Sequence, residues 1–246
     1  MPYLERKQRD LQRRVDLILG VGRELLLKSG YRGLTMTRIA ELTEYSKGTI
    51  YQHFSCKEEI VHRLATESIK CLLLLLDRVK GYQGNGMLKV ALVAEAYILF
   101  YRLYPLEFSL LSTIRSRSVR ERINAQKYAE IESLEQSALN IISGIVADSV
   151  NEGELMLIEG FSAEELASGI WFMIYGGLTL HEGSSGEKVE NDKYFHLTRK
   201  NFQYYVSSWS WSRQVADEFG GAEELNSQLS QIKNVLFKDE MAKSAW

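Results

Sequence analysis

Residues 34–64, LTMTRIAELTEYSKGTIYQHFSCKEEIVHRL, carry the clearest structural pattern in this chain. It contains two short segments with a helical spacing of apolar residues. Each segment follows a hydroxyl side chain suited to cap a helix N-terminus, Thr35 before the first and Ser46 before the second. We therefore expect helices at about 36–43 and 47–53. Two short helices joined by a tight turn are typical of a helix-turn-helix.

Longer amphipathic segments flank this stretch. Upstream, apolar or small residues recur three and four positions apart, at Leu11, Val15, Ile18, Gly22 and Leu25. This spacing predicts a helix over about 8–29 that ends at Gly30, because glycine readily takes the left-handed conformation of helix ends. Downstream, Ser55 and Glu58 predict a capping box that opens a helix over about 56–79.

The rest of the chain is predicted to be helical as well. Segments with helical spacing lie at about 87–103, 105–115, 119–151, 163–181 and 192–212. After the sequence EFGG, residues 222–240 place apolar side chains on one stripe, which predicts an extra C-terminal helix: Leu225, Leu229, Ile232 and Leu236. With only 2 prolines in 246 residues and few alternating strand patterns, the predicted fold class is all-α.

Composition excludes several classes of protein. The longest apolar run, CLLLLL at 71–76, is far shorter than the roughly 20 residues of a membrane-spanning helix. The charged N-terminus is not typical of a signal peptide. The 2 cysteines, Cys56 and Cys71, are too few for a disulfide framework. We therefore expect a soluble, cytoplasmic protein.

Charge is unevenly distributed along the chain. Residues 1–57 hold 11 Lys and Arg against 6 Asp and Glu, whereas residues 58–246 hold 19 against 26. A basic head before an acidic remainder favours a polyanionic partner for the N-terminal segment.

The predicted helix at 47–53 has a distinctive outer surface. At about 100° per residue, Ile50 and Phe54 point inward, and the outward residues are Lys47, Gly48, Thr49, Tyr51, Gln52 and His53. An α-helix fits the DNA major groove, where such side chains meet base edges and phosphates. Gln can pair bidentately with adenine, and glycine permits close approach of the backbone. Lys57, in the first turn of the next helix, is either a phosphate ligand or a solvated side chain.

Residues 11–64, centred on the quoted stretch, resemble the DNA-binding domain of the tetracycline-repressor (TetR) family of bacterial transcriptional regulators. The specific features are Ile39-Ala40, then Ser-Lys-Gly-Thr-Ile-Tyr-x-His-Phe from Ser46 onward, then Lys-Glu-Glu from Lys57. The remainder of the chain is similar to the family only in length and helix order. The resemblance implies a helix-turn-helix domain over residues 1–57 and an effector-binding and dimerisation domain over 58–246, connected by the helix at 56–79.

Carried over to this sequence, the resemblance implies a set of DNA-contacting residues. They are Thr35 and Thr37 at phosphates, Lys57 as a phosphate clamp, and Tyr45, Ser46, Lys47, Gly48, Thr49, Tyr51, Gln52 and His53 in the turn and second helix. The family usually has Ala-Gly-Val in the turn, where this chain has Thr43-Glu44-Tyr45. Tyr45 therefore either packs on the head or contacts the DNA backbone. Cys56 replaces a serine that is common in the family.

The resemblance also implies a homodimer and an unidentified, largely apolar small-molecule effector. Candidate pocket residues are Tyr97, Phe100, Tyr101, Phe108, Phe172 and Tyr175, each of which is otherwise an ordinary core residue. The helices within 171–212 are the candidates for the dimer interface, with Gly169, Gly176 and Gly177 allowing close helix approach. The basic run Arg115, Arg117, Arg120 and Arg122 either attracts an anion or forms a solvated loop.

The resulting hypothesis is a dimeric repressor that binds a palindromic operator in double-stranded DNA and is released by its effector. A DNA-binding adaptor of the same fold, controlled by a protein partner, is the alternative. His53, Cys56 and His62 fit no familiar zinc spacing, and no G-x-S-x-G motif is present, so we expect no metal, no cofactor and no enzymatic activity.

Overall fold

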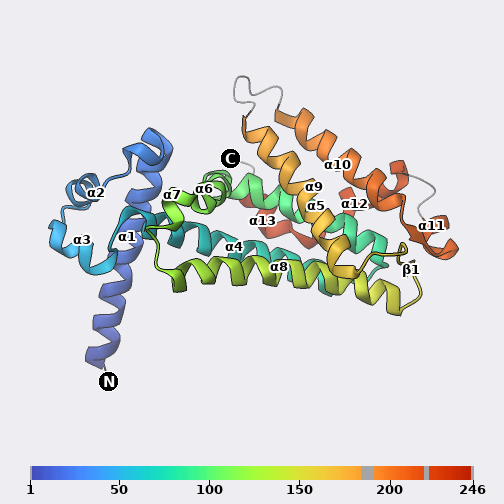
Figure 1. Ribbon diagram of the computed structural model, residues 1–246, viewed down its shortest axis with the longest axis horizontal. Helices are drawn as coiled ribbons and strands as arrows, with labels where there is room; N and C mark the ends of the chain where they lie inside the picture. Colours follow the sequence, from blue (N-terminus) through green and yellow to red (C-terminus); the bar gives the residue numbers. More distant parts are fainter. Residues whose placement is uncertain (1, 184–190, 219–221, 245–246) are drawn as a thin grey trace. The chain divides into compact units, whose positions relative to one another are not determined.

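The computed structural model describes residues 2–183, 191–218 and 222–244 (Figure 1). These residues form thirteen helices and one pair of two-residue strands. The elements are α1 (Pro2–Gly33), α2 (Met36–Thr43), α3 (Lys47–His53), α4 (Lys57–Gly81), α5 (Gly86–Leu103), α6 (Pro105–Arg115), α7 (Arg117–Arg120), α8 (Ala125–Asn151), β1 (Leu155–Met156), α9 (Ala163–Gly183), α10 (Asn191–Ser207), β2 (Ser210–Trp211), α11 (Arg213–Glu218), α12 (Ala222–Leu236) and α13 (Lys238–Ser244). The all-α prediction is confirmed. None of the described helices has the length and apolarity needed to span a membrane.

The chain divides into two compact units. The first, called the head unit, comprises Met1–Ser68 and Leu106–Glu132, and the second, called the body unit, comprises Ile69–Pro105 and Ser133–Trp246. Helices α4 and α8 each begin in the head unit and end in the body unit. The head unit therefore combines the N-terminal helices with a segment that lies far from them in the sequence.

The head unit is built around α1, α2 and α3, with α2 in contact with both neighbours. Its core consists of aliphatic side chains that are fully removed from solvent: Ile18, Leu34, Ile39, Ile50 and Ile60. Helices α2 and α3 have the predicted bounds. Helix α1 is longer than predicted and is interrupted at Gly30, whose φ of 62° is outside the helical range. The predicted stop signal is therefore present, and one further turn follows it.

The body unit is organised around α5. Fifteen residues of α5, from Gly86 to Tyr101, are buried. Four helices cover it, because α9, α10, α12 and α13 all contact α5. The two-residue strands β1 and β2 pair antiparallel, with Leu155 opposite Trp211. The predicted C-terminal helix is present as α12, which buries Leu225 and Leu229.

Some predicted helix boundaries were wrong. The continuous helix expected over 119–151 is divided into α7 and α8, because Asn124 starts a new helix by accepting a hydrogen bond from the Gln126 N–H at 2.8 Å. Helix α10 ends at Ser207, before the strand β2, and the C-terminal prediction is divided at buried Phe237. The apolar periodicity continues across these breaks, so it could not reveal them.

Two local predictions are corrected by hydrogen bonds and packing. The carboxylate that accepts from the Ser55 N–H is that of Glu59, at 2.8 Å, and not that of Glu58. Two of the three glycines assigned to the dimer interface serve packing within the chain. A Cβ at Gly177 would lie 2.4 Å from Thr198 Oγ1, and a Cβ at Gly169 would lie 2.9 Å from the Tyr205 hydroxyl. Close approach of α9 to α10 therefore explains these glycines.

Candidate nucleic-acid interface

Helix α2 begins at a hydroxyl cap. Thr35 has an extended backbone, and its Oγ1 accepts a hydrogen bond from the Arg38 N–H at 3.2 Å. This bond satisfies one of the free N–H groups at the helix start and confirms the predicted cap. Thr35 and Thr37 are both exposed at this helix N-terminus, where anionic groups are favoured.

The turn between α2 and α3 depends on Glu44. Its φ of 58° and ψ of 24° are left-handed, and among the described residues it is the only non-glycine with a positive φ. The Glu44 N–H points to the carbonyls of Ala40 and Glu41, and the Tyr45 N–H donates to Ala40 O at 3.1 Å. These bonds satisfy the last carbonyls of α2, as in helix ends that normally use glycine. The departure from the family's turn sequence is therefore accommodated by a strained glutamate. Tyr45 is half-buried.

Helix α3 presents one face to the core and the rest of its surface to solvent. Ile50 is 0% exposed and Phe54 is 7% exposed, so the inward face is the predicted one. Lys47, Gly48, Tyr51 and Gln52 are exposed, and Thr49 and His53 are half-buried. The structure thus places six of the residues assigned to DNA on one short helix.

The first turn of α3 is fixed by two hydroxyl groups. Ser46 Oγ accepts a hydrogen bond from the Thr49 N–H at 3.0 Å, and it lies 2.9 Å from Thr49 Oγ1. Gly48 lies between them, and a Cβ there would meet only Ser46 Oγ at 3.6 Å, an ordinary van der Waals distance. Packing within the chain therefore does not require a glycine at this position.

Lys57, the candidate phosphate clamp, has partners inside the head unit. Its Nζ donates to the Tyr31 carbonyl oxygen at 2.9 Å and lies 3.9 Å from the centroid of the Tyr31 ring. The carbonyl at the end of α1 and the aromatic face both stabilise a cation. These contacts offset the unfavourable position of Lys57 at the start of α4.

Two carboxylates in the first turn of α4 connect the parts of the head unit. Glu58 accepts hydrogen bonds from the Tyr31 hydroxyl at 2.7 Å and from Arg122 at 3.1 Å. Glu59 pairs with Lys127 at 2.7 Å. Burial alone would raise the pKa of each glutamate, but these hydrogen bonds outweigh burial and hold both pKa values below the usual range. Burial and the bond to Glu58 raise the pKa of the Tyr31 hydroxyl.

Sequence reasoning missed this connection, because its partners lie more than sixty residues apart along the chain. The sequence predicts an anion site or a solvated loop at the basic run. Three of its arginines have partners within the chain, and the side chains of Arg117 and Arg122 are still 90% and 67% exposed. Arg122 pairs with Glu58, Arg117 with Glu121, and Arg120 lies over the Tyr128 ring. The acidic first turn of α4 and the basic run are the sequence features that could have indicated this pairing.

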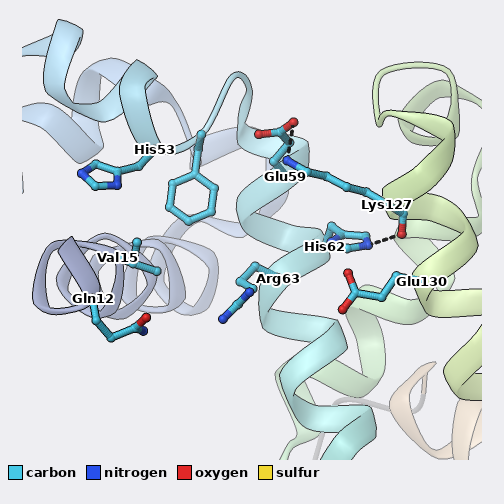
Figure 2. Close-up of a pocket in the computed structure, with 9 residues that line it drawn as sticks. Gln12, Val15, His53, Glu59, His62, Arg63, Lys127 and Glu130 are labelled. Atoms are coloured by element: carbon cyan, nitrogen blue, oxygen red, sulfur yellow. Dashed lines mark hydrogen bonds and ion pairs between the residues drawn. The ribbon is translucent and has the colours of Figure 1, made fainter. Parts of the chain in front are cut away.

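A crevice of about 240 Å³ lies within the head unit beside the end of α3 (Figure 2). Its walls come from α1, the end of α3, α4 and the start of α8, and its lining residues are Gln12, Val15, His53, Phe54, Glu59, His62, Arg63, Lys127 and Glu130. Figure 2 shows Lys127 reaching Glu59, and the His62 ring directed at the Lys127 carbonyl, 2.5 Å away. Burial lowers the pKa of His62. Because Gln12 and His53 line the same crevice, α1 passes near the last residue of α3 at this point.

The candidate effector residues are distributed over α5, α6 and α9. Tyr97, Phe100 and Tyr101 are buried on α5 in the body unit, and Tyr101 packs edge-on against Phe195. Phe108 is buried in the head unit. On α9, Phe172 is 64% exposed and Tyr175 is half-buried beside Trp171.

Comparison with known proteins points to one family. Residues 18–64 match the family model described as bacterial regulatory proteins, tetR family. The chain is 28% identical over 165 residues to the HTH-type transcriptional regulator QacR of Staphylococcus aureus, covering 55% of this chain and 81% of that protein. It is 23% identical over 143 residues to the fatty acid metabolism regulator protein of Bacillus subtilis, covering 56% of this chain and 69% of that protein.

Solved structures share the fold. The regulator FadR of Bacillus subtilis, in complex with stearoyl-CoA, matches with a TM-score of 0.59 at 20% identity, covering 78% of this chain and 97% of that one. A putative regulator from Saccharomonospora viridis, in complex with choline, matches with a TM-score of 0.65 at 15% identity, covering 82% and 100%. Residues 18–64 therefore form a DNA-binding domain of the tetR family of bacterial regulatory proteins, and the chain is similar to regulators of that family in sequence and in fold.

Proposed function

We propose that this regulator is a homodimeric repressor that binds a palindromic operator through α3 and is released by a small-molecule effector. The observation that carries the proposal is the surface of α3. Four of its seven residues are exposed, while Ile50 is buried in the core. One of the exposed residues is Gly48, where packing against the described residues does not require a glycine. A helix of this kind presents side chains and backbone to a major groove.

The DNA contacts follow the order of side chains along the two helices. Gln52 and Thr49 meet base edges, and Lys47 and Tyr51 meet the flanking phosphates. Thr35 and Thr37 approach a phosphate at the start of α2, where free N–H groups favour an anion. Lys57 contributes to phosphate binding if it leaves the Tyr31 carbonyl.

The dimer interface is proposed on α9 and α10, which pack together in the body unit. Phe172 and Leu180 are 64% and 71% exposed, and Gly176, between them on α9, has open space beside it. On α10, Tyr204 is 61% exposed. Exposed apolar side chains on two adjacent helices match the composition of a homodimer interface core. Two-fold symmetry of the dimer would make the operator a palindrome.

This interface is tested by sedimentation of a double variant. Phe172→Glu with Leu180→Glu should convert the protein to a monomer and weaken operator binding, because charges would be buried without partners. Val235→Glu, on the exposed face of α12, is the matched control and should leave the dimer intact. A double variant that remains a dimer would place the interface elsewhere.

The effector is proposed to be largely apolar and to bind in the body unit near α5, whose buried aromatic residues include Tyr97, Phe100 and Tyr101. The relatives were solved with ligands as different as stearoyl-CoA and choline, so the fold does not specify one effector. The effector would favour a conformer with weaker DNA binding, and the shift cannot exceed its differential affinity for the two conformers.

The experiment is a selection of duplexes from a random pool by the unmodified protein, followed by a thermal-shift screen of small molecules. The proposal predicts a palindromic consensus, and a stabilising compound that releases the selected duplex. A consensus without any stabilising compound, but with release by a protein partner, would support the adaptor instead. Failure to enrich any sequence would contradict both.

A further inference from the structure

The first turns of α1 form an unsupported helical arm. We define the N-terminal arm as residues 2–14; every described side chain from Leu4 to Arg14 is exposed. Figure 1 shows this part of α1 extending past α3, on the side away from α2. The arm also precedes residue 18, where the match to the family model begins. The helix-turn-helix core therefore does not explain why these residues are helical and exposed.

The arm is rich in cations, most of which form no ion pair with the described residues. It holds Arg6, Lys7, Arg9, Arg13 and Arg14 against Glu5 and Asp10. Within the described part of the chain, its one ion pair joins Arg13 to Asp10 at 3.9 Å. Three of the other cations surround a shallow groove of about 290 Å³, which Asp10 and Leu11 complete: Arg6, Lys7 and Arg14. Three cations around one groove form a site suited to an anionic group.

The position and composition of the arm favour DNA as its partner. Gln12 and Val15 line the same crevice as His53, the last residue of α3 (Figure 2). Within the head unit, the arm therefore begins beside one end of the helix assigned to DNA. Thirteen helical residues reach about 20 Å, the length of about six base pairs. The only large apolar side chains described in this segment are Leu4 and Leu11, 68% and 43% exposed, which is little for a protein or membrane partner.

We propose that the N-terminal arm binds phosphates of the DNA flanking the half-site, with Arg6, Lys7 and Arg14 as the ligands of one phosphate group or of two neighbouring ones. This inference rests on the proposed function, since it requires α3 to lie on DNA. The arm contributes affinity and salt dependence but no base preference, because phosphates are the same at every sequence. DNA also stabilises a helix that packing alone supports poorly.

The test compares two triple variants on two duplexes. The arm variant is Arg6→Gln, Lys7→Gln and Arg14→Gln, which keeps helix propensity. The control variant is Lys80→Gln, Arg213→Gln and Lys238→Gln, which removes the same charge from exposed positions of the body unit. One duplex, selected by the unmodified protein, carries about ten flanking base pairs at each end, about one helical turn. The other is trimmed to the half-sites.

On the long duplex, we expect the arm variant to bind roughly tenfold more weakly at about 0.1 M salt, and its salt slope to fall by about 0.9 for each phosphate that it no longer neutralises. The affinity of the control variant should fall much less. Trimming should weaken the unmodified protein and leave the arm variant unchanged. Asp10→Asn, which removes the carboxylate of the groove, should instead tighten binding to the long duplex.

Unchanged affinity and salt slope in the arm variant, or no response to trimming in the unmodified protein, would overturn the inference while specific binding remained intact. An arm variant that changes the oligomeric state without changing the salt slope would overturn it as well. If the unmodified protein selects no duplex, the proposed function itself fails. Circular dichroism of the arm variant shows whether its helix is retained, and Asp10→Asn decides the question if it is not.

Discussion

Among single residues, Glu44 in the turn and Gly48 on α3 are unusual for their positions. Glu44 occupies a left-handed conformation that favours glycine, and Gly48 occupies a helical position where an alanine would fit. Glu44 lowers the stability of the fold, whereas Gly48 is a glycine that the fold does not require. Substitution of Glu44 should therefore change mainly stability, and substitution of Gly48 should change mainly DNA binding.

Glu44→Gly should stabilise the head unit. A non-glycine residue in a left-handed conformation costs about 1 kcal/mol, and glycine removes that strain at some cost in unfolded-state entropy. We expect a net gain of about 0.5 kcal/mol or less in the free energy of unfolding, measured by urea denaturation. The matched control is Glu41→Gly, in the middle of α2, which should lose about 1 kcal/mol. Equal losses in both variants would show that Glu44 is not strained.

Gly48→Ala should leave the fold intact and weaken DNA binding. Alanine gains up to about 1 kcal/mol of helix stability over glycine, and its methyl group meets only Ser46 Oγ at 3.6 Å. On DNA, the methyl group would separate the backbone of α3 from the groove. We expect roughly tenfold weaker binding, about 1.4 kcal/mol, in a gel-shift titration. Gly20→Ala is the control, because Gly20 lies at an exposed position of α1 and a Cβ there would have no neighbouring atom within 4 Å. This variant should bind DNA normally.

At the scale of elements, local signals predicted helices well and distant contacts determined the rest. Helices α2 and α3 have the predicted bounds because Thr35 and Ser46 are caps that act within three residues of themselves. The attachment of residues 106–132 to the head unit could not be predicted, since it depends on Arg122 and Lys127 meeting the start of α4. Periodicity also placed buried aromatics on α5, but it could not show that Phe108 belongs to the head unit.

The contact between α9 and α10 is tested by two adjacent glycines. Gly177→Ala would place a methyl group 2.4 Å from Thr198 Oγ1, so α9 and α10 must separate, at a cost of about 1 to 3 kcal/mol. Gly176→Ala points into open space within the chain and should be neutral or stabilising by up to about 1 kcal/mol, when both variants are compared in the Phe172→Glu and Leu180→Glu background that removes the proposed dimer contact. Thermal denaturation of the two variants measures the difference. If Gly176→Ala is as damaging as Gly177→Ala, the packing described for α9 and α10 is incorrect.

At the scale of the whole molecule, buried ion pairs make stability depend on pH. Glu95, on α5, is 5% exposed and binds Arg199 on α10 and Lys233 on α12, the latter at 3.3 Å. Burial alone would raise the pKa of Glu95, but these two cations outweigh burial and hold it below the usual value. Because the folded pKa is the lower one, the stabilisation is complete above the unfolded value of about 4.3 and is lost as pH falls through the folded value.

Glu95→Gln should therefore destabilise the protein near pH 7 and make its acid unfolding less steep. Removing one partner of a buried ionic group typically costs about 3 to 5 kcal/mol. The free energy of unfolding measured from about pH 7 to pH 3 should converge for the variant and the unmodified protein at the acid end. Glu132→Gln, at an exposed position, is the control. Parallel curves with a constant separation would contradict a lowered pKa at Glu95.

Sequence reading by α3 can be measured as the affinity of the unmodified protein and of Gln52→Ala for a selected duplex, its single-base variants and a scrambled duplex. We predict that the unmodified protein prefers the selected duplex by at least about 1,000-fold. Gln52→Ala should lose about 1 to 3 kcal/mol of discrimination at one base pair of each half-site and keep the rest, whereas Lys57→Ala should weaken binding to every sequence. Equal affinity of the unmodified protein for the selected and scrambled duplexes would contradict the claim.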